Sequence, residues 1–548
     1  MRWVLLASAA AICATSFQTV WAAAPVDEAV PLSGQVMPDG TVRRVMPAGP
    51  TQTAAPNAAG SAAVPSNPPA MPATTGIEMP ATQPTATPGG PTAMPPSPTP
   101  GADASGPVMT LEQALAAAYT SNPALLAARA QQRALDETLP RATAGWKPTV
   151  TLQGSYGSNA TDTENPTATS AGEGAQFKTH PLSGQVTVSQ PVFTGGRTFF
   201  GLRQAQHNVE AGRARLVSQE QQTLLDVVTA YFDVIQNRAT VELNQNNISV
   251  LQKQLDAAQD RFRVGEITRT DVAQSEARLK LGETQLIQAQ AQLVASIDAY
   301  RTAVGTTPAS LDRSPPLPSL PASEENALAT AQVNSPAVVA ARETEKASNA
   351  AVYVAFGGLL PTVTIDGTIA HSEGRQNSPF FGTSDIITDQ RAVTGNVRVP
   401  IYQAGTEFAS IRQAKHTASQ NRLLTAQAGR DVEENVANAW EAMRAATAAI
   451  RSNQQQVNAN QIAYNGVVQE AEVGSRTTLD VLNAEQELLN SQVALVRSQR
   501  DQYVAAYGLL ASMGMLTARS LGLPVDIYDP KAHSHSLIWK QFWPGAGE

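Results

Sequence analysis

The sequence predicts an α+β membrane protein in which a few short strands per chain join those of neighbouring chains in a β-barrel. Long coiled-coil helices continue from that barrel. Three observations predict this class. Short segments alternate apolar and polar residues, long segments carry an apolar residue at every seventh position, and both patterns occur twice along the chain as an internal tandem repeat.

The composition agrees with this class and argues against several others. Only 15% of the 548 residues are charged and 5% are aromatic, so the chain buries little bulky apolar surface per residue. The net charge of −8 argues against a nucleic-acid partner. The sequence has no phosphate loop, dinucleotide fingerprint or zinc-ligand spacing. We therefore expect no enzyme activity, no cofactor and no metal site.

The first 107 residues predict export and then a segment without a core. Residues 1–24 are typical of a secretory signal peptide, with Arg2 before an apolar stretch and small residues at 22–24. The single cysteine, Cys13, lies inside this segment, so the mature chain forms no disulfide. Residues 25–107 are rich in proline, alanine and threonine and predict a disordered periplasmic extension. A tether and a wall-binding segment are the two roles open to it.

The rest of the chain is predicted to hold two copies of one unit, at 108–320 and 321–518, followed by a tail at 519–548. The segment NPALLAAR at 122–129 returns as SPAVVAAR at 335–342, and Val264-Gly265 returns as Val473-Gly474. The first pair lies 213 positions apart and the second 209, a difference that a loop-length change explains. Each copy is expected to form a helix, two strands, a long helix and a shorter returning helix.

An apolar residue at every seventh position marks the long helices, as in a coiled-coil seam. In the first copy these residues are Val227, Val234, Val241, Ile248, Leu255 and Phe262, and in the second they are Val436, Met443, Ile450, Val457 and Tyr464. A helix over 197–265 would be about 100 Å long at 1.5 Å per residue. One helix over about 123–146 and another over about 270–304 are expected to flank it.

Four segments alternate apolar and polar residues, at about 148–157, 182–193, 361–370 and 391–401. Strands of this kind suit an outer-membrane barrel, with apolar side chains towards lipid and polar ones inside. A soluble sheet has the same period, but it needs a second layer over its apolar face. Known barrels have at least about eight strands, so the chain must oligomerise. Two chains give the smallest closed number and three give twelve, and the pattern alone does not choose between them.

Prolines are predicted to mark the four junctions between strands and helices, at Pro148, Pro191, Pro361 and Pro400. Aromatic residues gather beside them, as at the border of a membrane or in a packed junction. The polar connections 157–181 and 370–391 are expected to be extracellular loops.

With these elements the chain resembles the outer-membrane efflux protein family of TolC, in particular the branch that serves type I secretion. The resemblance rests on Leu111-Glu112-Gln113-Ala114-Leu115 before Asn122-Pro123, on Pro148-Thr149-Val150, on the two Val-Gly turns and on the tail from Tyr528 to His533. It implies a homotrimer with a twelve-stranded barrel in outer-membrane lipid and a periplasmic helical tunnel. It also implies a passive duct that works with a periplasmic membrane fusion (adaptor) protein and an inner-membrane ABC or proton-driven pump.

The same resemblance assigns the gate and the adaptor-docking site to the tips of two helical hairpins, at about 263–271 and 472–480. The matching residues are Val264, Gly265, Thr270, Asp271, Val473, Gly474, Arg476, Asp480 and Asn483. Arg476 is expected to hold the closed state through Thr270 and Asp271 of the neighbouring hairpin, and Asp480 to form an acidic constriction. Asn483 stands where a second acidic residue is common, and Ala471 where a gating tyrosine can occur.

Elementary helix chemistry gives these tips a simpler role as well. Gly265 and Gly474 suit helix C-termini, and Thr268 or Thr270 in one tip and Thr477 or Thr478 in the other suit N-caps. A first-turn aspartate also suits the helix dipole without any role in a pore. Two alternatives to the export duct therefore stay open: a structural coiled-coil protein of the envelope without transport, and an autonomous porin.

Overall fold

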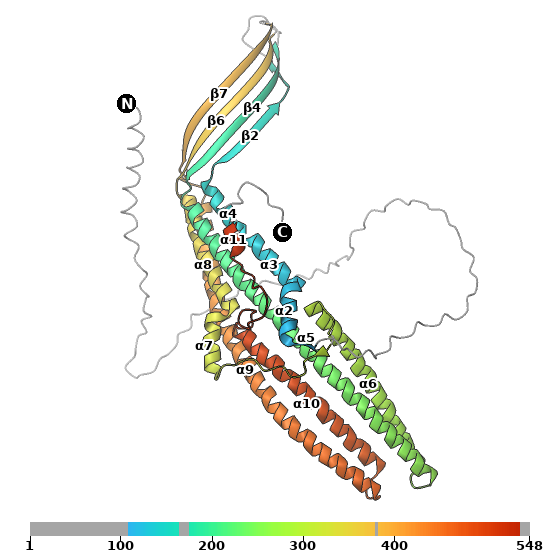
Figure 1. Cartoon of the computed structure of the whole chain (residues 1–548). Coiled ribbons are helices and arrows are strands. Elements are labelled where there is room, and N and C mark those ends of the chain that lie inside the picture. The colour runs from blue at the N-terminus through green and yellow to red at the C-terminus, as the bar shows by residue number, and fades with distance from the viewer. Residues whose placement is uncertain (1–107, 164–174, 309, 379–381, 537–548) are drawn as a thin grey trace, which may run out of the picture. The chain divides into compact units, whose positions relative to one another are not determined.

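The computed structural model describes residues 108–163, 175–308, 310–378 and 382–536 (Figure 1). The predicted signal peptide, the extension 25–107 and the end of the tail lie outside these residues. The described part is mostly helical and contains one large sheet. Within it, no helix combines the length and the apolar character needed to cross a membrane.

The sheet is a single antiparallel layer with the strand order β2-β4-β6-β7. These strands are β2 (Thr149–Tyr156), β4 (Ala175–Phe193), β6 (Thr362–Ser378) and β7 (Gly382–Arg398). A short strand, β3 (Asn159–Thr163), continues β2 along the same partner, β4. β2 and β7 are therefore the two edges of the sheet, and each has one side without a partner strand in the described chain.

The register places apolar side chains on one face and polar ones on the other. Leu152 lies opposite Val186, which lies opposite Ile369, and all three point to the same face because side chains alternate along a strand. One residue earlier on β2, Thr151 lies opposite Thr187, which lies opposite Thr368. No element among the described residues covers the apolar face, and Leu152 is 78% exposed.

The structure corrects the predicted strand ends. β4 begins at residue 175 rather than 182, β6 ends at 378 rather than 370, and β7 spans 382–398 rather than 391–401. Much of the predicted loops 157–181 and 370–391 is therefore strand. Backbone pairing continues as far as Ser378 opposite Gly382, whereas the apolar alternation stops earlier. Hydrogen bonds between strands do not depend on side-chain polarity, so alternation understates the length of the strands.

Pro191 also differs from its prediction, because it lies within β4 and not at the junction after it. The register between β4 and β6 shifts between Pro191 and Phe193. A proline has no N–H to donate to the ladder, and such an irregularity accommodates it within a paired strand.

Two long antiparallel helix pairs contain the longest helices of the described chain. Hairpin 1 consists of α5 (Arg197–Arg263) and α6 (Arg269–Val304), and hairpin 2 of α9 (Thr406–Glu472) and α10 (Thr478–Ser512). α5 and α9 each have 67 residues, or about 100 Å of helix at 1.5 Å per residue. α2 (Leu111–Ser121) and α3 (Pro123–Asp136) precede the first strands, and α7 (Glu324–Asn334) and α8 (Pro336–Phe356) precede β6.

The helix predicted over 123–146 is divided in the structure. α3 ends at Asp136, and α4 (Thr138–Thr143) and a 3₁₀ turn (Ala144–Trp146) follow. Pro140 has no N–H to donate to the carbonyl of Asp136, four residues earlier, so the α-helical ladder cannot continue through this point.

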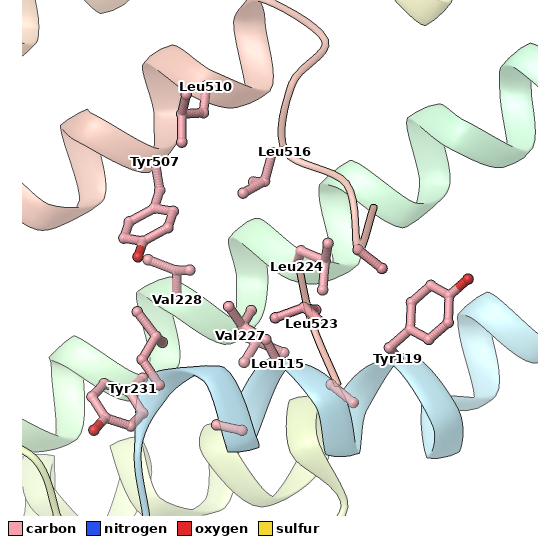
Figure 2. Packing of buried hydrophobic residues seen from close by; sticks show 14 of the residues in the cluster. Leu115, Tyr119, Leu224, Val227, Val228, Tyr231, Tyr507, Leu510, Leu516 and Leu523 are labelled. Carbon is pink, nitrogen blue, oxygen red and sulfur yellow. The ribbon is translucent and has the colours of Figure 1, made fainter. Parts of the chain in front are cut away.

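The main core lies where elements of both halves of the chain meet (Figure 2). It draws side chains from α2, α5 and α10 and from the segment after α10, including Leu115, Leu224, Tyr507, Leu516 and Leu523. The Tyr231 hydroxyl lies 3.1 Å from the carbonyl oxygens of both Met109 and Asp312. It thereby ties α5 to the parallel pair of β1 (Val108–Met109) and β5 (Ser310–Leu311).

The predicted heptad positions of α5 are mostly buried, whereas those of α9 after Val436 are partly buried. Val227, Val234, Val241 and Leu255 are buried, whereas Phe262, at the free end of hairpin 1, is exposed. Further contacts fix α5 between elements of the second half. Arg500 of α10 donates to Asp233 Oδ1 at 2.7 Å, and Glu343 of α8 lies 2.7 Å from His207 Nδ1.

A close approach of α3 and α5 depends on Gly212, and Gly212→Ala should destabilise the protein. A Cβ at this position would overlap the side chains of Leu135 and Gln132. Overpacking of this kind costs about 1–3 kcal/mol, which opposes the ~1 kcal/mol that alanine gains over glycine in a helix. We therefore expect a lower Tm than that of a helical Gly→Ala change in open space, in a thermal melt followed by circular dichroism. Gly466→Ala on α9 is the matched control, because nothing lies within 4 Å of its added Cβ. A Tm for Gly212→Ala that equals that of the control would contradict the close approach.

Candidate functional site

The free ends of the two hairpins have the same turn. In the first, Gly265 has φ of +80° and its N–H donates to Phe262 O, while the Glu266 N–H donates to Arg261 O. In the second, Gly474 has φ of +76° and the Ser475 N–H donates to Glu470 O. This pattern is a Schellman motif, which ends a helix and needs a residue that tolerates positive φ. The valines before the glycines, Val264 and Val473, are 78% and 80% exposed.

The structure decides which threonine caps each returning helix. Thr268 accepts from the Asp271 N–H, and the Asp271 carboxylate accepts from the Thr268 N–H and hydroxyl. Thr477 and Asp480 form the same capping box at the start of α10. Thr270 and Thr478, the other candidates, lie inside the first turns.

These caps also set the charge of the two aspartates. Hydrogen bonds from the Thr268 side chain and N–H hold the pKa of Asp271 below its usual value. The Thr477 N–H and then its hydroxyl do the same for the pKa of Asp480. Both carboxylates are therefore ionised at neutral pH. Each occupies the first turn of a helix, where the helix dipole also favours a negative charge.

Arg476 has a partner on its own hairpin. Its Nε donates to Glu470 Oε2 at 2.8 Å. Within the described residues of this one chain it hydrogen-bonds neither Thr270 nor Asp271. The predicted contact with a neighbouring hairpin stays a prediction, and Glu470 is a residue that the sequence reasoning missed.

Asn483 joins the two hairpins, a role that the sequence did not indicate. Its Oδ1 accepts from Arg278 Nη2 of α6 at 2.7 Å. Beside this contact Leu482 packs into a small apolar cluster with Leu251, Leu255 and Leu279 of hairpin 1. Ala471, at the position of the absent tyrosine, is buried. The two hairpins are therefore in contact within one chain near their free ends, whereas the tips themselves are exposed.

An open groove of about 470 Å³ lies between the hairpins above this cluster. Its lining is mainly amide and apolar, and comprises Thr240, Asn244, Gln285, Gln288, Ala289, Gln292, Gln486, Leu489, Asn490 and Val493. It contains no charged side chain. In the part of the chain that the structure describes, no three His, Cys, Asp or Glu side chains gather where a metal could bind.

The two hairpin ends differ in charge at matching positions. Arg261, Arg263 and Arg278 of hairpin 1 correspond to Glu470, Glu472 and Glu487 of hairpin 2 at the common spacing of 209 positions (470 − 261). Arg261 donates to Glu266 in its own turn, whereas Glu470 accepts from Arg476. An alignment of the two copies contains this reversal of charge, but only the shared turn geometry shows that the positions are structurally equivalent.

Comparisons with known proteins agree with this arrangement. Residues 114–306 and 327–515 each match the family described as outer membrane efflux protein. The outer membrane efflux protein BepC of Brucella suis is 34% identical over 433 residues, which cover 79% of this chain and 91% of that protein. Outer membrane protein TolC of Vibrio cholerae is 23% identical over 410 residues, which cover 74% and 90% of the two chains.

A solved structure shares the fold at lower identity. The outer membrane protein VceC of Vibrio cholerae superimposes with a TM-score of 0.59 at 20% identity, over 74% of this chain and 96% of that one.

The capping box of hairpin 2 leads to a local prediction. Thr477→Ala removes the hydroxyl that accepts from the Asp480 N–H, and loss of an N-cap costs about 1 kcal/mol. We expect the first amides of α10 to exchange with deuterium about fivefold faster in mass-spectrometric hydrogen exchange. Thr478→Ala, at the next residue, should leave this exchange unchanged. Equal effects of the two substitutions would mean that Thr477 is not the cap.

Proposed function

Because the chain belongs to the outer membrane efflux protein family, we propose that it is one subunit of a homotrimeric channel that gives cargo a passive route out of the cell. The chain resides in the outer membrane and extends a helical part into the periplasm. One observation carries the proposal: the sheet and the helices of a single chain both have surfaces without a partner in the described residues.

The sheet supports closure by neighbouring subunits. Unpaired strand edges are not tolerated in lipid, because their N–H and C=O groups have no partner there. β2 and β7 of adjacent subunits would pair and remove both edges. With β3 counted as part of β2, three chains supply twelve strands. The apolar face of Leu152, Val186 and Ile369 would then contact lipid, and the threonine face would line the pore.

The helices, like the sheet, have surfaces without a packing partner in the described chain. α5 packs along α8 and α10 of the other half of its own chain, but no comparable packing joins α9 to α3 or α6. The corresponding surfaces are apolar and exposed, with Ile287 and Val294 on α6 and Leu423 and Ile462 on α9. Ile287 and Val294 are seven residues apart and lie on one stripe of α6. We infer that α9 of one subunit packs on α6 and α3 of the next.

Exposed aromatic and aliphatic side chains gather where the strands meet the helices. They include Trp146, Phe199, Ile401, Tyr402 and Phe408, and Ile401 is 94% exposed. Such residues suit the inner border of the membrane, where rings with one polar edge are favoured. The sheet would lie in the outer membrane on one side of this belt, and the hairpins would extend into the periplasm on the other.

The hairpin ends are proposed to form the gate and the adaptor-docking surface. In a trimer, three copies of Asp480 would surround the entrance as ionised carboxylates, and Arg476 would exchange Glu470 for Thr270 and Asp271 of the neighbouring hairpin when the gate closes. A periplasmic adaptor would dock at Val264, Gly265, Val473 and Gly474, and an ABC or proton-driven pump would supply the energy. The units 108–320 and 321–518 are proposed to be duplicated halves of this channel.

Bilayer recording tests the channel and its acidic entrance. Purified trimers in a planar bilayer should give single-channel currents, whereas a purely structural envelope protein would give none. Asp480→Asn should lower the cation-to-anion permeability ratio by about twofold, because fixed charge at a constriction sets ion preference. Asp298→Asn, which removes the same charge from the far end of α6, is the control and should leave the ratio unchanged.

The pH dependence of this selectivity has a defined sign. The pKa of Asp480 is held below the usual 3.8, so the carboxylate stays charged as the pH falls to that value. Cation preference should therefore persist at pH 4 and decline only below about 3.8. A preference lost between pH 7 and 5 would point to another group at the entrance.

A further inference from the structure

A buried carboxylic acid lies in the interface between the two hairpins. Glu485 is on α10, two residues after Asn483, which contacts Arg278, and it is only 6% exposed. Its helix neighbours Leu482, Leu488 and Leu489 are buried on the same side. Within the described part of the chain, its Oε2 has no hydrogen-bond partner. An ionised carboxylate without a partner is costly in such surroundings.

The elements around Glu485 offer it no compensating cation. α10 packs against α9, α5 and α6. On α9, Tyr464 is the titratable neighbour, and its own pKa is raised by burial and then by Glu485. From α5, the neutral side chain of Gln254 reaches Tyr464. On α6, the guanidinium of Arg278 is engaged by Asn483.

Burial is the sole cause that shifts this group, and it raises the pKa of Glu485 to about 7. The acid therefore changes its charge close to physiological pH. The matching residue of the first copy, Glu276 (485 − 209), is exposed on α6. The buried acid is thus a property of the place where α10 meets hairpin 1, and not of the repeated sequence.

We propose that Glu485 makes the packing of hairpin 2 against hairpin 1 depend on a proton. When its carboxyl is neutral, α10 stays packed on α5 and α6. When the carboxyl ionises, water must reach it, and the adjoining groove at Gln486, Leu489 and Asn490 offers the route. The free end of hairpin 2 then moves away from hairpin 1. The inference that this motion opens a gate rests on the proposed function. The inferred change in packing does not depend on it.

The direction of the pH effect follows from the raised pKa. The packed state holds the proton more tightly than the separated state, whose carboxyl has an ordinary pKa of 4.5. The packing contributed by this group is therefore complete below pH 4.5 and is lost as the pH rises through about 7. Acid favours the packed hairpins and mild alkali favours their separation.

Electron–electron resonance between two spin labels measures this separation directly. Gln288→Cys on α6 and Asn490→Cys on α10 line opposite sides of the groove, and the mature chain has no cysteine of its own. Labelled mature chains are diluted with unlabelled chains, so that each trimer reports one intramolecular distance. We expect the distance distribution to shift to longer values between pH 5 and pH 8, with a midpoint between the pKa values of the separated and packed states, 4.5 and about 7.

Two substitutions in the labelled chain decide whether Glu485 is responsible. Glu485→Gln keeps the size of the neutral acid and cannot ionise, so its distribution should stay short at both pH values. Glu487→Gln, an identical change at an exposed position of α10, should retain the full shift. A shift that survives Glu485→Gln, or labelled chains that show no shift at all, would overturn the proposal. Bilayer currents recorded from the same preparations test the channel separately, because a conducting trimer without the shift refutes only the proton dependence.

Discussion

The backbone hydrogen bonds at the edges of the sheet are the constraint on which the rest of the structure depends. Within one chain, β2 and β7 each leave a row of N–H and C=O groups without partners, and one face of the sheet is apolar and uncovered. Unpaired strand edges are not tolerated in lipid, and an uncovered apolar face is unfavourable in water. In the proposed trimer, strands of neighbouring subunits would pair with both edges and lipid would cover the apolar face.

The helices also have apolar surfaces without a partner in the described chain. α5 is held on two sides by α8 and α10 of its own chain, with Arg500–Asp233 and His207–Glu343 across these contacts. α9, with the same length and the same place in its half, keeps apolar side chains exposed. In the proposed trimer, α9 would obtain the corresponding contacts from α6 and α3 of a neighbouring subunit. The match to the outer membrane efflux protein family confirms the resemblance that the sequence motifs suggested.

At the hairpin ends, local hydrogen bonds explain some of the residues and contacts between the hairpins explain others. Each end is a Schellman turn followed by a capping box, and this local chemistry accounts for Gly265, Gly474, Asp271 and Asp480 without reference to a pore. The residues that distinguish the two ends are those that reach across hairpins or change sign between the copies. Asn483 and Glu485 belong to the first group. Both residues lie on α10 where it meets hairpin 1, and this contact makes α10 differ from the otherwise similar helix α6.

The sequence by itself determined the strand–helix order, the two long heptad helices, the Val-Gly turns and the alternating faces, because each follows from a short period or from the chemistry of adjacent residues. Only the tertiary structure decided the strand ends, the division of the helix at Pro140, the choice of Thr477 as cap, the Arg278–Asn483 contact and the burial of Glu485. The apolar–polar alternation is lost where both faces of a sheet are polar, and the sequence does not distinguish a buried glutamate from an exposed one. The packing of distant segments, which no local pattern encodes, fixes those outcomes.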